Sequence, residues 1–190
     1  MLDKQIDMKK KTMLELERVD CEEYHSLDKI PLVVILEDIR SLNNIGSIFR
    51  TSDAFRVEKI YLCGITATPP NPDIHKTALG AEDSVDWEYS ADTLSVINKL
   101  KSSGYKVCAI EQVNGSVDFT EFEISESVKY AVILGNEVKG VSQVAVDEAD
   151  VCLELPQYGT KHSLNVSITG GIVIWNFFLW FRAYHILPRL

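Results

Sequence analysis

The chain has 190 residues, of which 46% are hydrophobic and 25% are charged, a balance typical of a globular protein with room for one α/β domain. The formal net charge is −9, which argues against a uniformly basic nucleic-acid binder because phosphate contacts require Lys and Arg. A local basic face can still exist, since net charge is a sum over the whole surface. The four cysteines form no C-x-x-C pair, so we expect no metal site. Three of them lie in apolar strand-like runs and are expected to be buried, reduced thiols of a cytoplasmic protein.

Residues 1–28 are charged and show no strand pattern. We expect them to form an amino-terminal arm, followed by a single domain over residues 29–190. A helix is expected within the arm over residues 13–24, where apolar residues recur at helical offsets. We favour a solvated arm over an extension that contacts a partner or nucleic acid. The densest basic cluster of the chain lies here and consists of Lys4, Lys9, Lys10 and Lys11.

The first predicted strand, residues 32–36, is a continuous apolar run of the kind found in buried parallel strands. Asn43 or Asn44 is expected to cap the helix that follows. Arg50 points away from the apolar face of this helix. An outward-facing Arg is usually only solvated, but its place beside the sheet edge suggests a cleft or a subunit interface. The apolar face comprises Ile45, Ile48, Phe49, Ser52 and Phe55.

Strand and helix patterns then alternate along the chain. Residues 80–88 are expected to be irregular, and residues 111–128 to form an acidic loop. Further strands are predicted over residues 59–63, 105–110, 128–134 and 151–155. Helices are predicted over residues 73–78, with Asp73 as the cap, and over 93–100 and 141–146. The alternation predicts an α/β fold with a mainly parallel sheet and helices on both faces.

Residues 163–181 carry no charge and by length could cross a membrane. We reject a membrane span, because the stretch holds several polar and glycine residues. Its strongly apolar part, residues 172–181, is also only about half of the ~20 residues that a span requires. A helix that is apolar all round is buried or lies at an interface, and aromatic residues favour a homodimer contact. These aromatic residues are Trp175, Phe178, Trp180 and Phe181.

No G-x-G-x-x-G turn follows the first strand and no P-loop motif is present, so neither kind of nucleotide site is supported. What remains is a set of glycine-containing turns at predicted strand ends. Gly135 and Gly140 allow the main chain to approach a ligand closely. Leu155 and Leu164 bracket the last loop with apolar surface. Such a pocket suits a neutral adenine held by backbone groups between aliphatic side chains.

Five polar residues could act on a substrate, although each taken alone has a simpler role, such as capping a helix or bracing a turn. They are Asn44, Arg50, Glu137, Ser163 and Asn165. They lie in three motifs: Asn-x-Gly-x-x-x-Arg-Thr over residues 44–51, Gly-Asn-Glu-x-x-Gly over 135–140, and Ser-Leu-Asn-Val-Ser over 163–167. Together these motifs resemble the SpoU (TrmH-like) class of the SPOUT RNA methyltransferases, from about Pro31 to about Tyr184.

The resemblance implies that S-adenosyl-L-methionine binds in a carboxyl-terminal trefoil knot built from about Val128 to Trp175. It also implies a homodimer that transfers a methyl group to a ribose 2′-oxygen of RNA. The favoured target is tRNA, and rRNA is the alternative; no metal and no membrane is implied. The implied cofactor-binding residues are Gly135, Asn136, Gly140, Leu155 and Leu164, together with the strand end near residues 109–111.

Roles carried over by position make Arg50, reaching in from the partner subunit, the residue that orients or deprotonates the 2′-hydroxyl. We favour orientation, because an Arg side chain normally stays protonated. Ser163 would act with Arg50 near the target phosphate and ribose. Asn44, Glu137 and Asn165 would hold the loops and the methionine moiety of the cofactor.

The chain departs from the family pattern at two places that could alter the pocket or the helix start. Gln157 stands where many members have Met, and residues 168–171 replace a small Ala. Larger members carry an amino-terminal RNA-binding domain, so here the expected RNA surface is the dimer face with the amino-terminal lysines, Arg56, Lys161 and His162. Two alternatives stay open: a methyltransferase for a non-RNA substrate, and a non-catalytic cofactor- or RNA-binding module.

Overall fold

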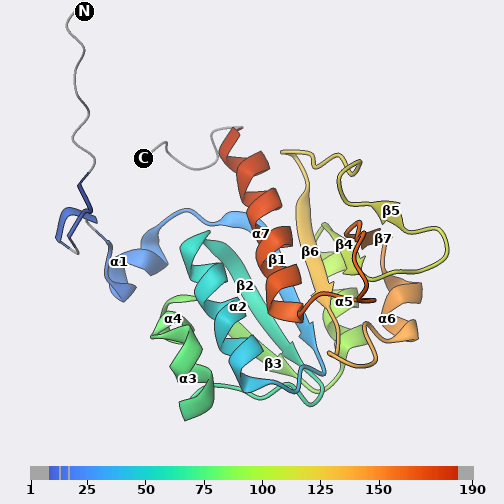
Figure 1. The fold of residues 1–190 in the computed structure, drawn as a ribbon, viewed down its shortest axis with the longest axis horizontal. Coiled ribbons are helices and arrows are strands. Elements are labelled where there is room, and N and C mark those ends of the chain that lie inside the picture. The colour runs from blue at the N-terminus through green and yellow to red at the C-terminus, as the bar shows by residue number, and fades with distance from the viewer. Residues whose placement is uncertain (1–8, 13, 17, 184–190) are drawn as a thin grey trace, which may run out of the picture.

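The computed structural model describes residues 9–12, 14–16 and 18–183. Their centre is a sheet in which every strand pair is parallel (Figure 1). The seven strands follow the order β3-β2-β1-β6-β4-β7-β5. The predicted mainly parallel α/β sheet is therefore confirmed. The strands are β1 (Ile30–Glu37), β2 (Val57–Cys63), β3 (Trp87–Ser90), β4 (Tyr105–Ile110), β5 (Val117–Asp118), β6 (Lys129–Leu134) and β7 (Val151–Glu154).

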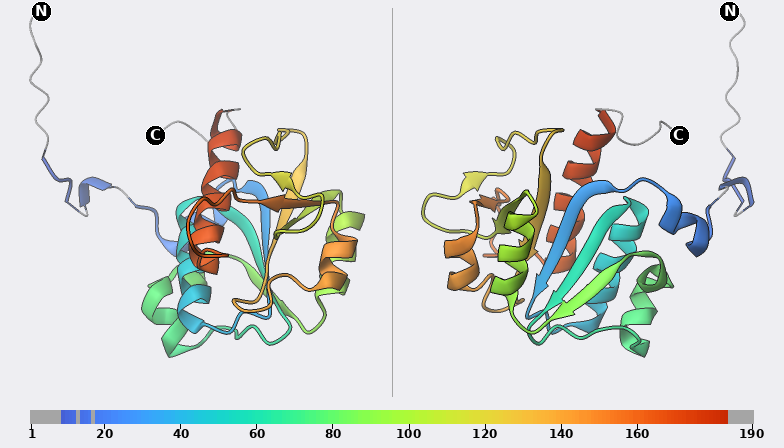
Figure 2. Two further views of the ribbon diagram at one scale, coloured as in Figure 1. Left: turned by 45° about the vertical axis from the view of Figure 1, so that its right-hand side comes forward. Right: turned by 180° about the vertical axis from the view of Figure 1, so that it is seen from behind.

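Helices cover both faces of this sheet (Figure 2). On one face lie α2 (Leu42–Ala54) and α7 (Val166–Ala183), which pack against each other. The short helices α3 (Pro72–Ala78) and α4 (Ala81–Ser84) pack beside α2. On the other face lie α5 (Thr93–Ser102) and α6 (Gln143–Glu148).

The burial of β1 inside the sheet explains its unbroken apolar sequence. Leu32, Val34 and Leu36 belong to the core on the α2 and α7 side. Val33 and Ile35 belong to the separate core on the α5 side. Successive side chains of a strand point to opposite faces, so a strand covered on both faces needs apolar residues at every position.

Several predicted boundaries are corrected by the hydrogen bonds at helix starts. Ser41, and not Asn43 or Asn44, caps α2, and its hydroxyl accepts a hydrogen bond from the Asn44 N–H at 3.3 Å. Asn71 caps α3 in place of Asp73, whose N–H donates to the Asn71 side chain at 2.9 Å. The expected irregular stretch at 80–88 contains α4 and the start of β3.

The expected single helix over residues 13–24 is wrong within the part of the arm that the structure describes. A 3₁₀ helix (Leu14–Leu16) and a separate helix α1 (Cys21–Ser26) are found instead. Asp20 separates them, because its side chain accepts a hydrogen bond from the Glu23 N–H at 2.8 Å and so starts α1. Three residues named in the sequence predictions lie outside the described residues: Lys4, Met13 and Tyr184.

The helix α7 is long and apolar enough to span a membrane by length and composition alone. One side of it packs onto the sheet, where Gly170 approaches Leu134 and Ile48. The buried residues of this side are Val166, Gly170, Val173, Ile174, Phe177 and Phe181. Four large apolar residues of α7 are exposed and form a stripe along the helix, at Ile168, Ile172, Trp175 and Leu179. Of the aromatic residues expected at a dimer contact, only Trp175 belongs to this stripe, because Phe181 is buried and Phe178 and Trp180 pack partly against the core.

We predict that Gly46→Ala destabilises the protein, although Ala is the better helix former by about 1 kcal/mol. A Cβ atom at Gly46 would overlap the Ile74 carbonyl oxygen and the Thr77 hydroxyl, so α2 and α3 would have to separate. Chemical unfolding should show a loss of about 1–3 kcal/mol. Asn98→Ala, at an exposed position of α5, serves as the control and should change stability by less than about 0.5 kcal/mol. Equal or greater stability of Gly46→Ala would contradict the close packing.

Candidate functional site

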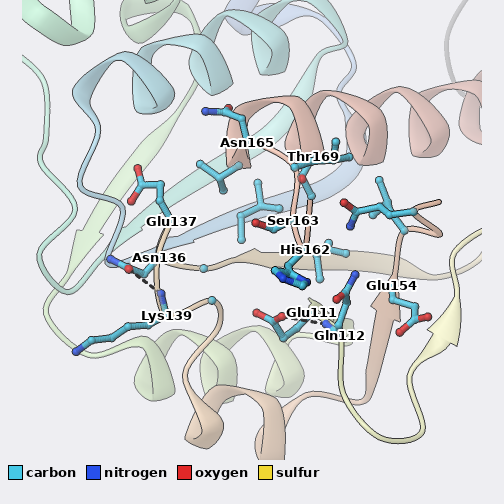
Figure 3. Close-up of a pocket in the computed structure, with 18 of the residues that line it drawn as sticks. Glu111, Gln112, Asn136, Glu137, Lys139, Glu154, His162, Ser163, Asn165 and Thr169 are labelled. Carbon is cyan, nitrogen blue, oxygen red and sulfur yellow. Dashed lines mark hydrogen bonds between the residues drawn. The ribbon is translucent and has the colours of Figure 1, made fainter. Parts of the chain in front are cut away.

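A cavity of about 500 Å³ opens at the carboxyl ends of β4, β6 and β7 (Figure 3). Three loops enclose it: the segment after β4, the turn over residues 135–140 after β6, and the loop from β7 to α7. Open parallel sheets bind ligands at this edge, and the volume lies within the range of small-molecule sites. The lining residues with ionisable side chains are Glu111, Glu137, Lys139, Glu154 and His162.

A chain of hydrogen bonds joins the three motifs beside this cavity. The Asn44 side chain donates to Glu137 Oε1 at 3.0 Å. The Asn165 side chain in turn donates to Asn44 Oδ1 at 3.1 Å. Asn165 also starts α7, because its Oδ1 accepts from the Ser167 N–H at 2.9 Å. Side chains separated by 93 and 121 residues in sequence are thus linked, and the three motif segments lie side by side.

The Glu137 carboxylate is the acceptor on which this connection depends. Besides Asn44, it accepts hydrogen bonds from the backbone N–H groups of Arg40 at 3.0 Å and Ser41 at 2.9 Å. Partial burial by itself raises the pKa of Glu137, but these hydrogen bonds together outweigh it and hold the pKa below its ordinary value. The side chain is therefore ionised at neutral pH and joins the turn after β6 to the start of α2.

Asn136 shapes the turn that carries Glu137. Its side chain donates to the Asp38 carbonyl oxygen at 2.7 Å and accepts from the N–H groups of Val138 and Lys139 at 3.0 and 3.1 Å. Gly140 closes the turn with φ at +71°, a conformation that favours glycine. A Cβ atom at Gly135 would overlap the backbone of Gly140, so both motif glycines are required by the tight approach of the two ends of the turn.

Two acidic residues hold the next stretch of this loop; Glu111 was expected only as part of the strand end at 109–111, and Glu37 was not selected from the sequence. Glu111, directly after β4, accepts a hydrogen bond from the Val141 N–H at 2.8 Å. Glu37, only 5% exposed at the end of β1, accepts from the Ser142 N–H and hydroxyl, both at 2.8 Å. A carboxylate at the last position of a buried strand, or just beyond it, was the signal that could have identified them.

The cavity brings together most of the predicted site residues. All five predicted cofactor-binding residues line it, as do Glu137, Ser163 and Asn165. Asn44 is 8% exposed and lies one hydrogen bond behind the lining. Arg50 is exposed on α2 and is not part of the lining within one chain. The five cofactor-binding predictions concern Gly135, Asn136, Gly140, Leu155 and Leu164.

Both departures from the family pattern also fall at the cavity. Gln157 lines it, and so does Thr169 from the replaced segment at 168–171. The strand end expected to contribute, residues 109–111, supplies Ile110 and Glu111 to the lining. Within the described residues, no group of three or more His, Cys, Asp or Glu side chains is placed to hold a metal ion. The site therefore offers backbone groups, carboxylates and aliphatic side chains to a ligand.

An open parallel sheet with a ligand-sized cavity at its carboxyl edge defines an α/β ligand-binding protein. Within that class, residues 31–175 match the SpoU rRNA Methylase family. The match covers most of the chain, and the chain belongs to this family. The resemblance predicted from the three motifs is confirmed.

One similar protein is the 23S rRNA (guanosine-2′-O-)-methyltransferase RlmB from Neisseria meningitidis serogroup B. It is 26% identical over 149 residues, which cover 78% of this chain and 58% of the relative. An AdoMet-bound rRNA methyltransferase from Sinorhizobium meliloti superposes with a TM-score of 0.72 at 28% identity, over 83% of this chain and 57% of that one. A TrmH/SpoU tRNA modifying enzyme from A. aeolicus, at 23% identity, shares the fold with a TM-score of 0.78 over 87% of this chain and 84% of its own. The chain spans a little more than half the length of the curated relatives that it matches.

We predict that Glu137→Gln lowers the free energy of unfolding by about 1–2 kcal/mol at pH 7, because hydrogen bonds to a charged acceptor are replaced by weaker ones. The pKa of Glu137 is lowered in the folded state, so its stabilisation is complete above the ordinary value of 4.5 and is lost as pH falls through the folded pKa. The gap between the two proteins should therefore shrink below about pH 4.5.

Urea unfolding at a series of pH values measures this gap. Glu126→Gln, at an exposed position in the loop before β6, is the matched control and should follow the native protein within about 0.5 kcal/mol. A gap for Glu137→Gln that stays constant down to pH 3 would show that the carboxylate does not contribute through its charge.

Proposed function

We propose that this protein is an S-adenosylmethionine-dependent RNA methyltransferase that modifies a ribose 2′-oxygen, with tRNA as the substrate. The observation that carries the proposal is the convergence of Asn44, Glu137 and Asn165 through hydrogen bonds at the edge of one cavity. Each residue alone could serve only as a cap or brace. Their joint placement, together with membership of the SpoU family, favours a site built for one ligand.

The cavity fits the chemistry of S-adenosylmethionine. Leu155 and Leu164 provide apolar surface for an adenine, and the turn over 135–140 exposes main chain to it. The lining also holds the carboxylates of Glu111, Glu137 and Glu154, which favour a ligand that carries positive charge. When bound, the cofactor supplies a methyl group on a sulfonium, which is already a good leaving group and requires no metal.

The residues of this chain would then position the nucleophile. A ribose hydroxyl is weakly nucleophilic at neutral pH, so it must be aligned with the methyl carbon and lose its proton as the bond forms. Ser163 lines the cavity with an exposed hydroxyl that can bind the ribose or its phosphate. Arg50 is exposed and permanently charged, so we assign it to orienting the target phosphate and hydroxyl.

A homodimer accounts for the position of Arg50 outside the lining of its own cavity. Exposed apolar side chains run along α7 at Ile168, Ile172, Trp175 and Leu179, and the Trp175 ring packs on Phe55 at the end of α2. A contact between copies through this stripe would cover it and could bring Arg50 of the partner subunit to the cavity. Such an isologous contact would form two equivalent sites in each dimer.

We also infer that the chain is knotted between about Val128 and Trp175. The segment over 155–165 carries the chain from β7, near the sheet edge, back to α7 beside α2 and β1, and this return path passes the turn over 135–140 at the cavity. Pulling the protein by its two ends would test this inference. A knot keeps the extended chain shorter than the roughly 3.6 Å per residue of a free chain, whereas full extension would contradict it.

The remaining assignments are proposals about the whole protein. We propose that residues 1–28 act as an arm attached to one domain over residues 29–190, and that the protein works in the cytoplasm, where its cysteines stay reduced. Limited proteolysis that cut first inside the domain would contradict the arm. A tagged full-length protein recovered outside the cytoplasm would contradict the location.

We predict that the purified protein transfers label from tritiated S-adenosylmethionine to unmodified tRNA, and that the label appears as 2′-O-methyl nucleosides. Arg50→Ala and Ser163→Ala should each reduce transfer by at least about a hundredfold, since positioning of the nucleophile supplies much of such a rate. Cofactor binding, measured by calorimetry, should persist in Arg50→Ala. Transfer to rRNA fragments but not to tRNA would contradict the tRNA assignment and identify rRNA as the substrate. Cofactor binding without transfer to any RNA would favour a non-catalytic module.

We further predict that two inactive variants restore activity when they are mixed. Arg50→Ala supplies an intact Ser163, and Ser163→Ala supplies an intact Arg50 to the cavity of its partner. After subunit exchange at equal concentrations, half of the dimers are mixed and one site in each is complete, so about a quarter of native activity should return. Absence of recovery despite a demonstrated mixed dimer would place Arg50 at its own subunit's cavity.

A further inference from the structure

The loop between β7 and α7 carries a large aromatic side chain that the structure leaves in solvent. Tyr158 is 95% exposed, the highest value among the large hydrophobic residues of the described chain. No ring contact or hydrogen bond is formed by its side chain within the described residues. Tyrosine is intermediate in burial among residue types, so a ring that is exposed to this degree beside a cavity is available to stack on a binding partner.

The position of Tyr158 in the chain links it to the cavity. Gln157 immediately before it lines the cavity, and so do His162 and Ser163 shortly after it. Figure 3 shows His162 and Ser163 pointing into this space from the same loop. A nucleotide whose ribose reached Ser163 would therefore place its base or a neighbouring base within the span of this loop.

The chemistry of a ribose substrate explains what the ring would meet. A nucleotide inside a helix is stacked on both sides, whereas the bases of RNA loops and single strands are free to stack on a protein side chain. RNA-binding proteins provide this contact with aromatic rings, which stack on any base because every base has a π face. Lys161, exposed and without an ion pair in the described part of the chain, lies three residues further on and could bind a flanking phosphate.

Resting on the proposed function, we propose that Tyr158 is a positioning residue that stacks on an unpaired base of the substrate RNA, at or beside the methylated nucleotide. The loop from β7 to α7 then has two roles: it closes the cofactor cavity with Leu155 and Leu164 and holds the substrate base with Tyr158. This role predicts an RNA loop or single strand as the substrate, in preference to a continuous duplex.

Steady-state methylation of the mapped RNA tests the proposal through KM and kcat. Tyr158→Ala should raise KM for the RNA by about 5-fold to 150-fold, the loss that follows removal of one stacked base, while kcat changes less than about twofold. Tyr158→Phe and Tyr158→Trp keep a ring and should restore KM. Calorimetry should find cofactor binding unchanged in all three variants, which also shows that they are folded.

Salt dependence separates stacking from charge. Lys161→Ala should reduce the slope of log affinity against log salt by about one, while Tyr158→Ala should weaken binding and leave the slope unchanged. The native protein should also methylate the target in a loop and fail on the same sequence annealed to its complement. An unchanged KM in Tyr158→Ala, equal impairment of Tyr158→Phe, or equal rates on loop and duplex would each overturn the stacking role.

The outcomes also distinguish this proposal from the proposed function. Methylation by the native protein with no effect of Tyr158→Ala would leave the methyltransferase standing and reject only the role of Tyr158. A native protein that binds the cofactor and methylates no RNA would reject both.

Discussion

The site depends on one carboxylate that is surrounded by hydrogen-bond donors. Glu137 accepts from two backbone N–H groups at the start of α2 and from the Asn44 side chain. Asn44 Oδ1 in turn accepts a hydrogen bond from the Asn165 side chain at the start of α7. Buried or partly buried polar groups are costly unless they are paired, so each of these residues constrains the other two. The result is a rigid junction between the turn after β6, the start of α2 and the start of α7.

The placement of the charged residues is compatible with the proposed reaction on RNA, although the chain as a whole is acidic. The carboxylates of Glu111, Glu137 and Glu154 line the cavity, where they favour a cationic ligand such as a sulfonium. Lys161 and Arg50 are exposed outside or at the margin of that cavity, where phosphate groups could approach. The net charge of −9 is therefore compatible with the proposed function, in which the carboxylates would face the cofactor and the exposed basic residues would face RNA phosphates.

Much of the fold could be predicted from the sequence because its physical causes are local. The doubly buried strand β1 appears as an unbroken apolar run, and α2 shows its buried face through helical spacing. Cap choices were less predictable, because Ser41, Asn43 and Asn44 are all good caps and tertiary contacts decide among them. The Asn44 side chain does not cap α2, because it donates a hydrogen bond to Glu137, a residue 93 positions away.

The site residues were predictable only as members of motifs. The roles of Glu111 and Glu37 were not predicted, because their carboxylates accept hydrogen bonds from N–H groups 30 and 105 positions away in the chain, and no spacing in one sequence shows such a contact. The proposed approach of Arg50 to the cavity of a second copy would likewise be a property of an assembly. Periodicity within one chain contains no signal for it.

A crystal structure of the protein grown with S-adenosylmethionine would test the central claim, that three converging loops form a single methyl-donor site. We predict ligand density in the cavity, with the adenine between Leu155 and Leu164, the main chain of residues 135–140 in contact with the ligand, and the hydrogen bonds between Glu137, Asn44 and Asn165 intact. Ligand bound at another place on the protein, or bound in the cavity with these three side chains separated, would contradict the account.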